Sequence, residues 1–186
     1  MKKLILTAAI AVFGLSNAQT FGLKAGANVS SISNFDETKS KFGFYAGAFV
    51  NVPLAESFSL QPEVLYNSKG VKAEGSGDAK VNLDYISVPV MFQYKATPQF
   101  YLEAGPEFSF LASAKVKVDG NSEDFKDFVN GFDLGIGLGA GYDFTSSFGA
   151  NIRYVAGVTD IAKDNDGGDA ARNGVFQFGL TYKFGK

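Results

Sequence analysis

Residues 131–144 read GFDLGIGLGAGYDF, and the two sets of alternate positions in this stretch differ in kind. One set is apolar throughout, whereas the other holds only glycine and aspartate; Leu138 and Gly139 are typical neighbours. Because side chains alternate between the two faces of a β-strand, the stretch predicts a strand with one apolar face and one nearly bare face. Glycine weakens a strand, so the fold must compensate for this choice.

The same alternation recurs along the chain and gives eight predicted strands. They span residues 20–33, 41–52, 58–69, 81–94, 99–112, 131–144, 148–159 and 174–185. The apolar phase changes between Tyr85 and Ile86, where we expect a β-bulge. Pro62, Pro89 and Pro106 each remove a backbone donor inside a strand, so we expect bulges there as well.

The connections between these strands alternate in length. Those at about 34–40, 70–80, 113–130 and 160–173 are long and charged, and those at 53–57, 95–98 and 145–147 are short. Aromatic residues gather at two levels along the strands, as in the girdles of a lipid-facing band. We therefore predict an all-β fold: a closed, antiparallel, eight-stranded transmembrane β-barrel with short periplasmic turns and long extracellular loops. A secreted, lipocalin-like barrel with its apolar face inward is the alternative.

The chain begins MKKLILTAAIAVFGLSNAQT, which has the pattern of a secretory signal peptide. We place cleavage after Ala18, so that residues 1–18 are the signal peptide and 19–186 the barrel domain. Export through the periplasm to the outer membrane of a Gram-negative cell envelope follows from this arrangement. The expected partners are membrane lipid, the barrel-assembly machinery during insertion, and an unidentified extracellular or envelope partner of a monomeric barrel.

The amino-acid composition limits the functions and partners that the chain can have. Without Lys2 and Lys3 the chain has 15 basic and 19 acidic residues, and this net charge of −4 argues against nucleic acid as a partner. There is no cysteine and no histidine, so a disulfide framework and a Ser-His-Asp site are both impossible. We expect no enzymatic activity and no cofactor; a lipid-modifying enzyme is disfavoured by the missing histidine.

Charged residues occur at intervals on the predicted lumen face. They are Lys24, Glu63, Glu103, Glu107, Asp133 and Arg153. Arg153 is expected to contact at least one of the three glutamates, with Lys24 or Tyr101 completing the layer. Paired carboxylates can perform acid–base chemistry, but opposite charges in a narrow lumen also pair because unpaired burial is costly. The second interpretation predicts a plugged lumen.

Two loop segments are candidates for further sites. Asp164, Asp166 and Asp169 surround two glycines and offer hard oxygen ligands for Ca²⁺, but they lack the pattern of an EF-hand. A solvated loop is the preferred interpretation, and no metal is predicted. Phe125 in residues 121–130 and its apolar neighbours are expected to cap the barrel rim.

Several stretches together resemble the PorT-like outer-membrane β-barrel family. They are FGLKAGANVSSI, LQPEVLYNSKG, DYISVPVMFQY, LEAGPEFSFLASAK, FDLGIGLGAGYDF, IRYVAGVTDI and a closing FGLTYKFG. The resemblance implies a small outer-membrane barrel, and the family's namesake takes part in assembling a protein-secretion system. We predict a non-enzymatic barrel that acts as a structural or surface-interaction protein through its extracellular loops. A narrow, porin-like channel for small solutes or ions and an accessory role in secretion are the alternatives.

Overall fold

The computed structural model describes residues 19–34, 38–73, 79–118, 121–163 and 168–184. The predicted signal peptide, residues 1–18, lies outside the described residues. Within the described ranges, no helix is long and apolar enough to cross a membrane.

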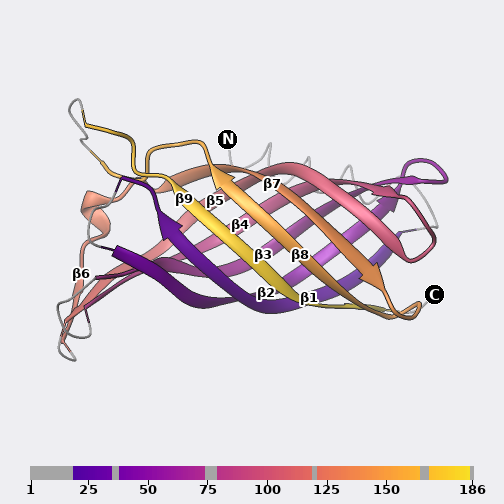
Figure 1. Ribbon diagram of the computed structural model, residues 1–186, viewed down its shortest axis with the longest axis horizontal. Coiled ribbons are helices and arrows are strands. Elements are labelled where there is room, and N and C mark those ends of the chain that lie inside the picture. Colours follow the sequence, from indigo (N-terminus) through magenta and orange to yellow (C-terminus); the bar gives the residue numbers. More distant parts are fainter. Residues whose placement is uncertain (1–18, 35–37, 74–78, 119–120, 164–167, 185–186) are drawn as a thin grey trace, which may run out of the picture.

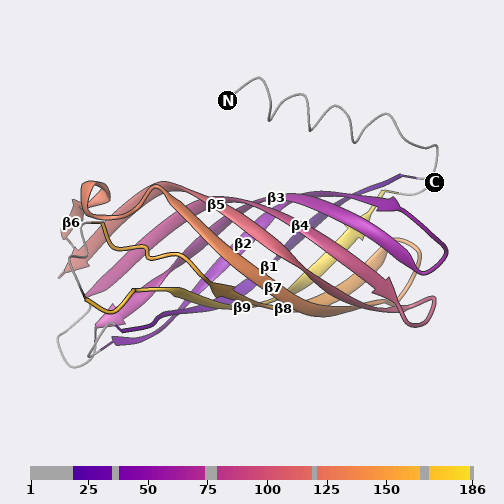
Figure 2. The same cartoon turned by 90° about the horizontal axis from the view of Figure 1, so that it is seen from above.

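The chain folds into a barrel of strongly tilted strands (Figures 1 and 2). The strands are β1 (Thr20–Ile32), β2 (Thr38–Pro53), β3 (Phe58–Ala73), β4 (Lys80–Lys95), β5 (Phe100–Val118), β6 (Asn121–Asp124), β7 (Phe132–Asp143), β8 (Phe148–Gly157) and β9 (Asn173–Lys183). All pairings are antiparallel, and pairing of β4 with β5 closes the ring of eight long strands. The short strand β6 pairs only with the end of β5 and precedes a 3₁₀ turn, η1 (Lys126–Phe128).

The first and last strands close the barrel as the sequence predicts. Gly22 of β1 stands opposite Lys183 of β9, and the amide of Phe184 donates to the carbonyl of Phe21 at 2.8 Å. Closure leaves no free strand edge in the ring, which a membrane-spanning sheet requires because lipid offers no hydrogen-bond partners. The prediction of a closed eight-stranded antiparallel barrel is confirmed.

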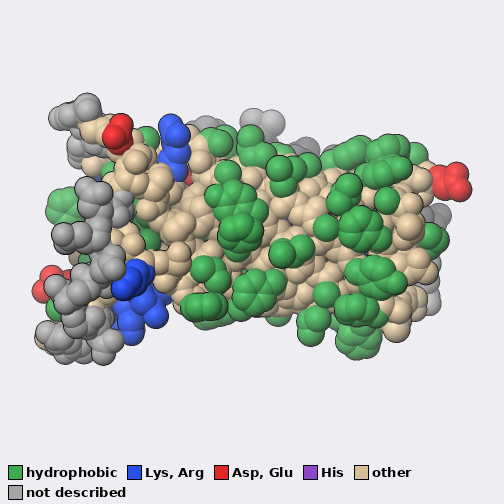
Figure 3. Space-filling model, in the orientation of Figure 1, with side chains coloured by type: hydrophobic (Ala, Val, Ile, Leu, Met, Phe, Trp, Pro, Cys, Tyr) green, Lys and Arg blue, Asp and Glu red, His purple; other side chains and the backbone are tan. Residues whose placement is uncertain are grey.

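The apolar set of alternate residues faces outward. Leu138 is 63% exposed and Leu180 is 64% exposed, and Figure 3 shows hydrophobic side chains spread along the face of the barrel that it draws. Aromatic rings pair across strands at both ends of this band. The ring pairs are Phe44–Tyr66, Phe110–Phe132 and Tyr154–Phe176 toward the long loops, and Phe58–Tyr94 and Phe148–Tyr182 toward the short turns. These two levels correspond to the predicted girdles.

A bulge lies next to the predicted position, in the β4–β5 pairing between Asp84 and Tyr85, but the extra residue belongs to β5 and not to β4. β4 alternates without interruption, and Leu83 and Tyr85 point inward because the lumen is apolar at this height. The extra residue is Ala112 in β5, since Asp84 pairs with Ser113 and Tyr85 with Leu111. A second extra residue lies in β2 between Ser40 and Tyr45.

The prolines do not cause bulges either. The pairing register is the same on both sides of Pro62, Pro89 and Pro106. Each strand therefore tolerates the loss of one donor without inserting a residue.

Several strands continue into segments that the charged sequence marks as loops. β2 begins at Thr38, β3 runs to Ala73 and β5 runs to Val118. The start of β2 pairs with β3, the end of β3 also pairs with β4, and the end of β5 pairs with β4 and β6. This pairing stabilises these ends despite their many lysines, so the barrel wall extends well beyond the girdle nearest the long loops.

Candidate functional site

The lumen is crossed by a layer of four charged side chains centred on Arg153. The Arg153 Nε donates to Glu103 Oε1 at 2.7 Å, and its Nη1 and Nη2 donate to Glu63 Oε2 and Oε1 at 3.0 and 2.7 Å. Lys24 Nζ donates to Glu63 Oε1 at 2.9 Å. We call these four residues, which carry two positive and two negative charges, the Arg153 layer.

The layer is closed to water and its carboxylate oxygens are all hydrogen-bonded. Arg153 is 0% exposed, Glu63 1%, Lys24 2% and Glu103 3%. Gln61 Nε2 donates to Glu63 Oε1 at 2.9 Å, and Gln93 Nε2 donates to Glu103 Oε2 at 3.0 Å. Such pairing and hydrogen bonding is what makes the burial of four charges tolerable.

The structure separates Glu107 from this layer. Glu107 Oε1 accepts from Lys69 Nζ at 3.0 Å and from Ser109 Oγ at 3.2 Å, and the Ser87 and Ser109 hydroxyls are 2.7 Å apart. We call these four residues the Lys69 layer. Sequence reasoning missed Lys69, although it continues the inward phase of Gln61 and Glu63, because the following segment resembles a loop.

Beyond the Lys69 layer, an apolar cluster covers the lumen at the long-loop end. This apolar cap consists of Ile32, Val71, Leu83, Tyr85, Leu111, Ala114, Val129, Ile161 and Ala171. Val129 forms a bridge with Ala162, and Phe125 packs against the cluster, whereas Phe128 is 74% exposed. Lys69 Nζ lies 5.0 Å from the centre of the Tyr85 ring, so the layer and the cap are in contact.

The other candidate residues lie outside both layers. Asp133 accepts from Thr159 Oγ1 at 2.9 Å and from Asn173 Nδ2 at 2.8 Å, near the apolar cap. Tyr101 lies over Gly141 instead of completing the Arg153 layer.

The calcium candidate is only partly described. Asp164 and Asp166 lie outside the described residues, whereas Asp169 lies within them. The residues that the structure describes contain no group of three or more His, Cys, Asp or Glu side chains suited to a metal ion.

The glycines of β7 make room for the side chains that fill the lumen. A Cβ atom at position 141 would lie 2.1 Å from the Tyr101 ring, and one at position 137 would lie 2.8 Å from Met91 Cε. At position 139 it would lie 2.5 Å from the Ile152 carbonyl oxygen and 3.0 Å from Glu103 Oε1. Close packing of large residues from other strands therefore compensates for the glycines.

The Gly139→Ala substitution is expected to destabilise the barrel by about 1–3 kcal/mol, since the new methyl group has no room beside a backbone oxygen. Gly131→Ala is the matched control, because nothing lies within 4 Å of a Cβ there. Denaturant unfolding of both variants in detergent measures the difference. Equal stability of the two variants would contradict the close packing around Gly139.

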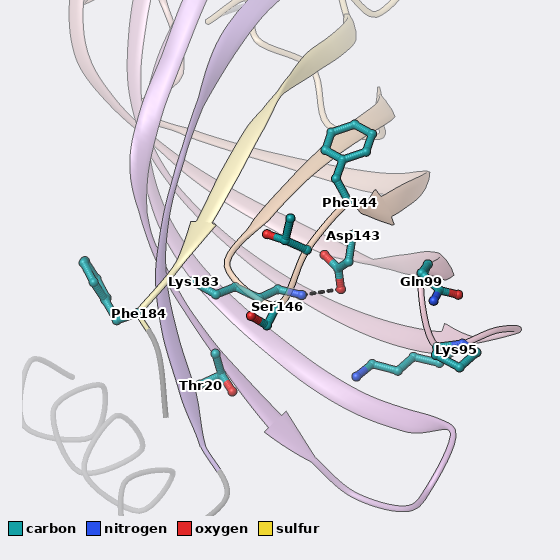
Figure 4. Close-up of a pocket in the computed structure, with 10 residues that line it drawn as sticks. Thr20, Lys95, Gln99, Asp143, Phe144, Ser146, Lys183 and Phe184 are labelled. Atoms are coloured by element: carbon teal, nitrogen blue, oxygen red, sulfur yellow. Dashed lines mark hydrogen bonds and ion pairs between the residues drawn. The ribbon is translucent and has the colours of Figure 1, made fainter.

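A cavity opens at the short-turn end of the barrel. It has a volume of about 590 Å³ and is lined by residues including Thr20, Lys95, Gln99, Asp143 and Lys183. Figure 4 shows the Lys183 ammonium directed at the Asp143 carboxylate, with which it forms an ion pair. We call this cavity the vestibule; it lies where β1 begins and β9 ends.

A closed barrel with an apolar outer wall, two aromatic girdles and a polar lumen defines an integral outer-membrane β-barrel protein. The chain belongs to the family described as outer membrane protein beta-barrel domain, whose model matches residues 17–163. The protein therefore resides in the outer membrane of a Gram-negative bacterium, with the vestibule on the periplasmic side. The match contains nothing specific to the PorT-like group, so that assignment stays a prediction.

Three solved structures illustrate the shared fold. Neisserial surface protein A has a TM-score of 0.57 at 17% identity, over 89% of this chain and 97% of that one. Ail, the attachment invasion locus protein of Yersinia pestis, has a TM-score of 0.53 at 14% identity, with the same coverage of 89% and 97%. OprG from Pseudomonas aeruginosa has a TM-score of 0.51 at 16% identity, over 91% and 97%. No curated protein matches the chain by sequence.

Proposed function

We propose that this protein is a non-enzymatic outer-membrane barrel whose lumen is closed, and that it acts at the cell surface through its extracellular loops. The Arg153 layer carries the proposal, because its four charged side chains are each at most 3% exposed. Water that cannot contact these groups cannot form a continuous column through the barrel, and an eight-stranded barrel is just wide enough for side chains to fill.

Three successive barriers support a closed lumen. A solute from the periplasm would meet the Arg153 layer, then the Lys69 layer and then the apolar cap. Opening either charged layer separates buried ion pairs, which is energetically costly. Pairing also occupies Glu63 and Glu103, so neither carboxylate is available as a general acid or base.

A surface role fits the distribution of exposed groups. Phe128 follows the β6 hairpin and is 74% exposed at the extracellular end. Capture of partners from intact outer membranes, comparing wild type with Phe128→Ser, tests whether this segment takes part in an interaction. An accessory role in secretion, which the PorT-like resemblance suggests, is the alternative that such an experiment also addresses.

The vestibule favours a solute channel as the second candidate function, because it offers an entrance from the periplasm. We expect the purified wild-type barrel to give no steady ohmic conductance in planar bilayers. A sixteen-stranded porin in the same bilayers serves as the positive control. Steady conductance of the wild type would overturn the closed lumen and make the channel the better interpretation.

A further inference from the structure

Four lysines form one continuous row across the barrel wall. In the strand register, Lys39 of β2 stands opposite Lys72 of β3, Lys72 opposite Lys80 of β4, and Lys80 opposite Lys117 of β5. We call these four residues the lysine row.

The lysine row faces outward. The neighbouring residues Val71 and Val81 pair with each other and pack in or against the apolar cap, so they point into the barrel. Because side chains alternate along a strand, Lys72 and Lys80 point away from the lumen. Lys39 and Lys117, which are exposed, share this face through their pairing.

The arrangement concentrates positive charge on one side of the barrel. Directly opposed residues have Cβ atoms about 4.5–5.5 Å apart, and like charges at that spacing repel. Four adjacent strands place the row over about 14 Å of the wall. Lys115 adds a further cation two residues toward the membrane in β5, where it stands opposite Asn82 and Asp124.

The height of the lysine row above the extracellular aromatic girdle indicates which part of the membrane lies beside it. Lys39 lies three residues beyond Phe42 of the extracellular girdle, and Lys117 lies seven residues beyond Phe110. With a tilted strand, this places the row roughly 8–18 Å above the girdle.

We propose that the lysine row binds the phosphate groups of the glycolipid that forms the outer leaflet. Ammonium groups form strong charge-assisted hydrogen bonds with phosphate oxygens. The row lies on the side wall beyond the extracellular girdle, where it faces the outer part of the neighbouring glycolipid headgroups. This inference goes beyond the proposed function and does not depend on a closed lumen.

The test compares two variants that each remove two positive charges. Wild type, Lys72→Gln with Lys80→Gln, and the control Lys95→Gln with Lys163→Gln are reconstituted in phosphatidylcholine nanodiscs. Each is titrated with purified lipopolysaccharide, with the same lipid after phosphatase treatment, and with heparin as a soluble polyanion. Heat-modifiable gel migration verifies that all three barrels are folded.

We expect the Lys72 and Lys80 variant to bind lipopolysaccharide about 10- to 30-fold more weakly than wild type, and the control to change by less than about threefold. Phosphatase treatment should abolish the difference between the variants. Equal affinity of wild type and the Lys72 and Lys80 variant would overturn the proposal. Binding of heparin in place of the lipid would also overturn it, since the partner would then be a soluble polyanion.

Discussion

Replacement of Arg153 by methionine is expected to destabilise the folded barrel by about 3–5 kcal/mol. Methionine fills much of the same space, so the loss comes from the charge and not from a cavity. Glu103 would then lose its cation, and Glu63 would keep only Lys24 and Gln61 as side-chain donors. One buried carboxylate would then have no counter-charge, and leaving a buried charge unpaired is the costly way to disrupt a buried ion pair.

A second substitution distinguishes this explanation from poor packing. Arg153→Met with Glu103→Gln keeps the layer neutral, because Lys24 and Glu63 still balance each other. We expect the double variant to be more stable than Arg153→Met alone. The chain has no tryptophan, so unfolding is followed by far-ultraviolet circular dichroism or gel migration. A double variant that is less stable than either single variant would contradict the electrostatic account.

The second large loss of stability is expected when an arginine is placed on the lipid-facing side of the barrel. Leu138 lies midway along β7, is 63% exposed and points to the hydrocarbon between the girdles. We expect Leu138→Arg to destabilise the barrel by about 2–4 kcal/mol, because a charge at the bilayer midplane loses its hydration. The free energy of unfolding in lipid vesicles measures this cost.

Val118→Arg is the matched control for Leu138. Val118 is 47% exposed and lies at the extracellular end of β5, beyond the girdle. The same substitution should cost about 0–1 kcal/mol there. Similar costs at both positions would mean that the outer wall is not embedded in lipid as the girdles indicate.

The outer face and the Arg153 layer follow from the sequence for the same reason. Leu138 and Gly139 fall on opposite faces because a strand alternates, and no tertiary information is needed. Counting residues from the short turns brings Arg153 to the depth of Glu63 and Glu103, since the turns share one level. Glu107 lies four residues further along β5 than Glu103, which is enough to place it in a separate layer.

The errors of the sequence-based prediction arise where the polarity of a side chain does not match the direction in which it points. Leu83 and Tyr85 are apolar yet point inward, so the polarity pattern predicted an extra residue in β4, whereas the extra residue lies in the facing strand β5. Lys69 was missed because lysine and glycine next to it indicate a loop, whereas β3 continues to Ala73. The inward direction of Leu83 and Tyr85 and the continuation of β3 past Lys69 both depend on the apolar cap. This cap is built from segments distant in sequence.

The strands that contribute the residues of the Arg153 layer affect how the barrel assembles. Its members come from β1, β3, β5 and β8, so the layer becomes complete only after the last strand has joined the first. Glycine-rich strands specify their pairing weakly, and a slip of one residue turns every side chain to the opposite face. Such a slip at the junction of β1 and β9 would direct Lys24 into lipid and leave Glu63 with less positive charge. The ion pairs of the layer therefore favour the native register at ring closure, because a misaligned barrel would lose them and leave buried charges unpaired.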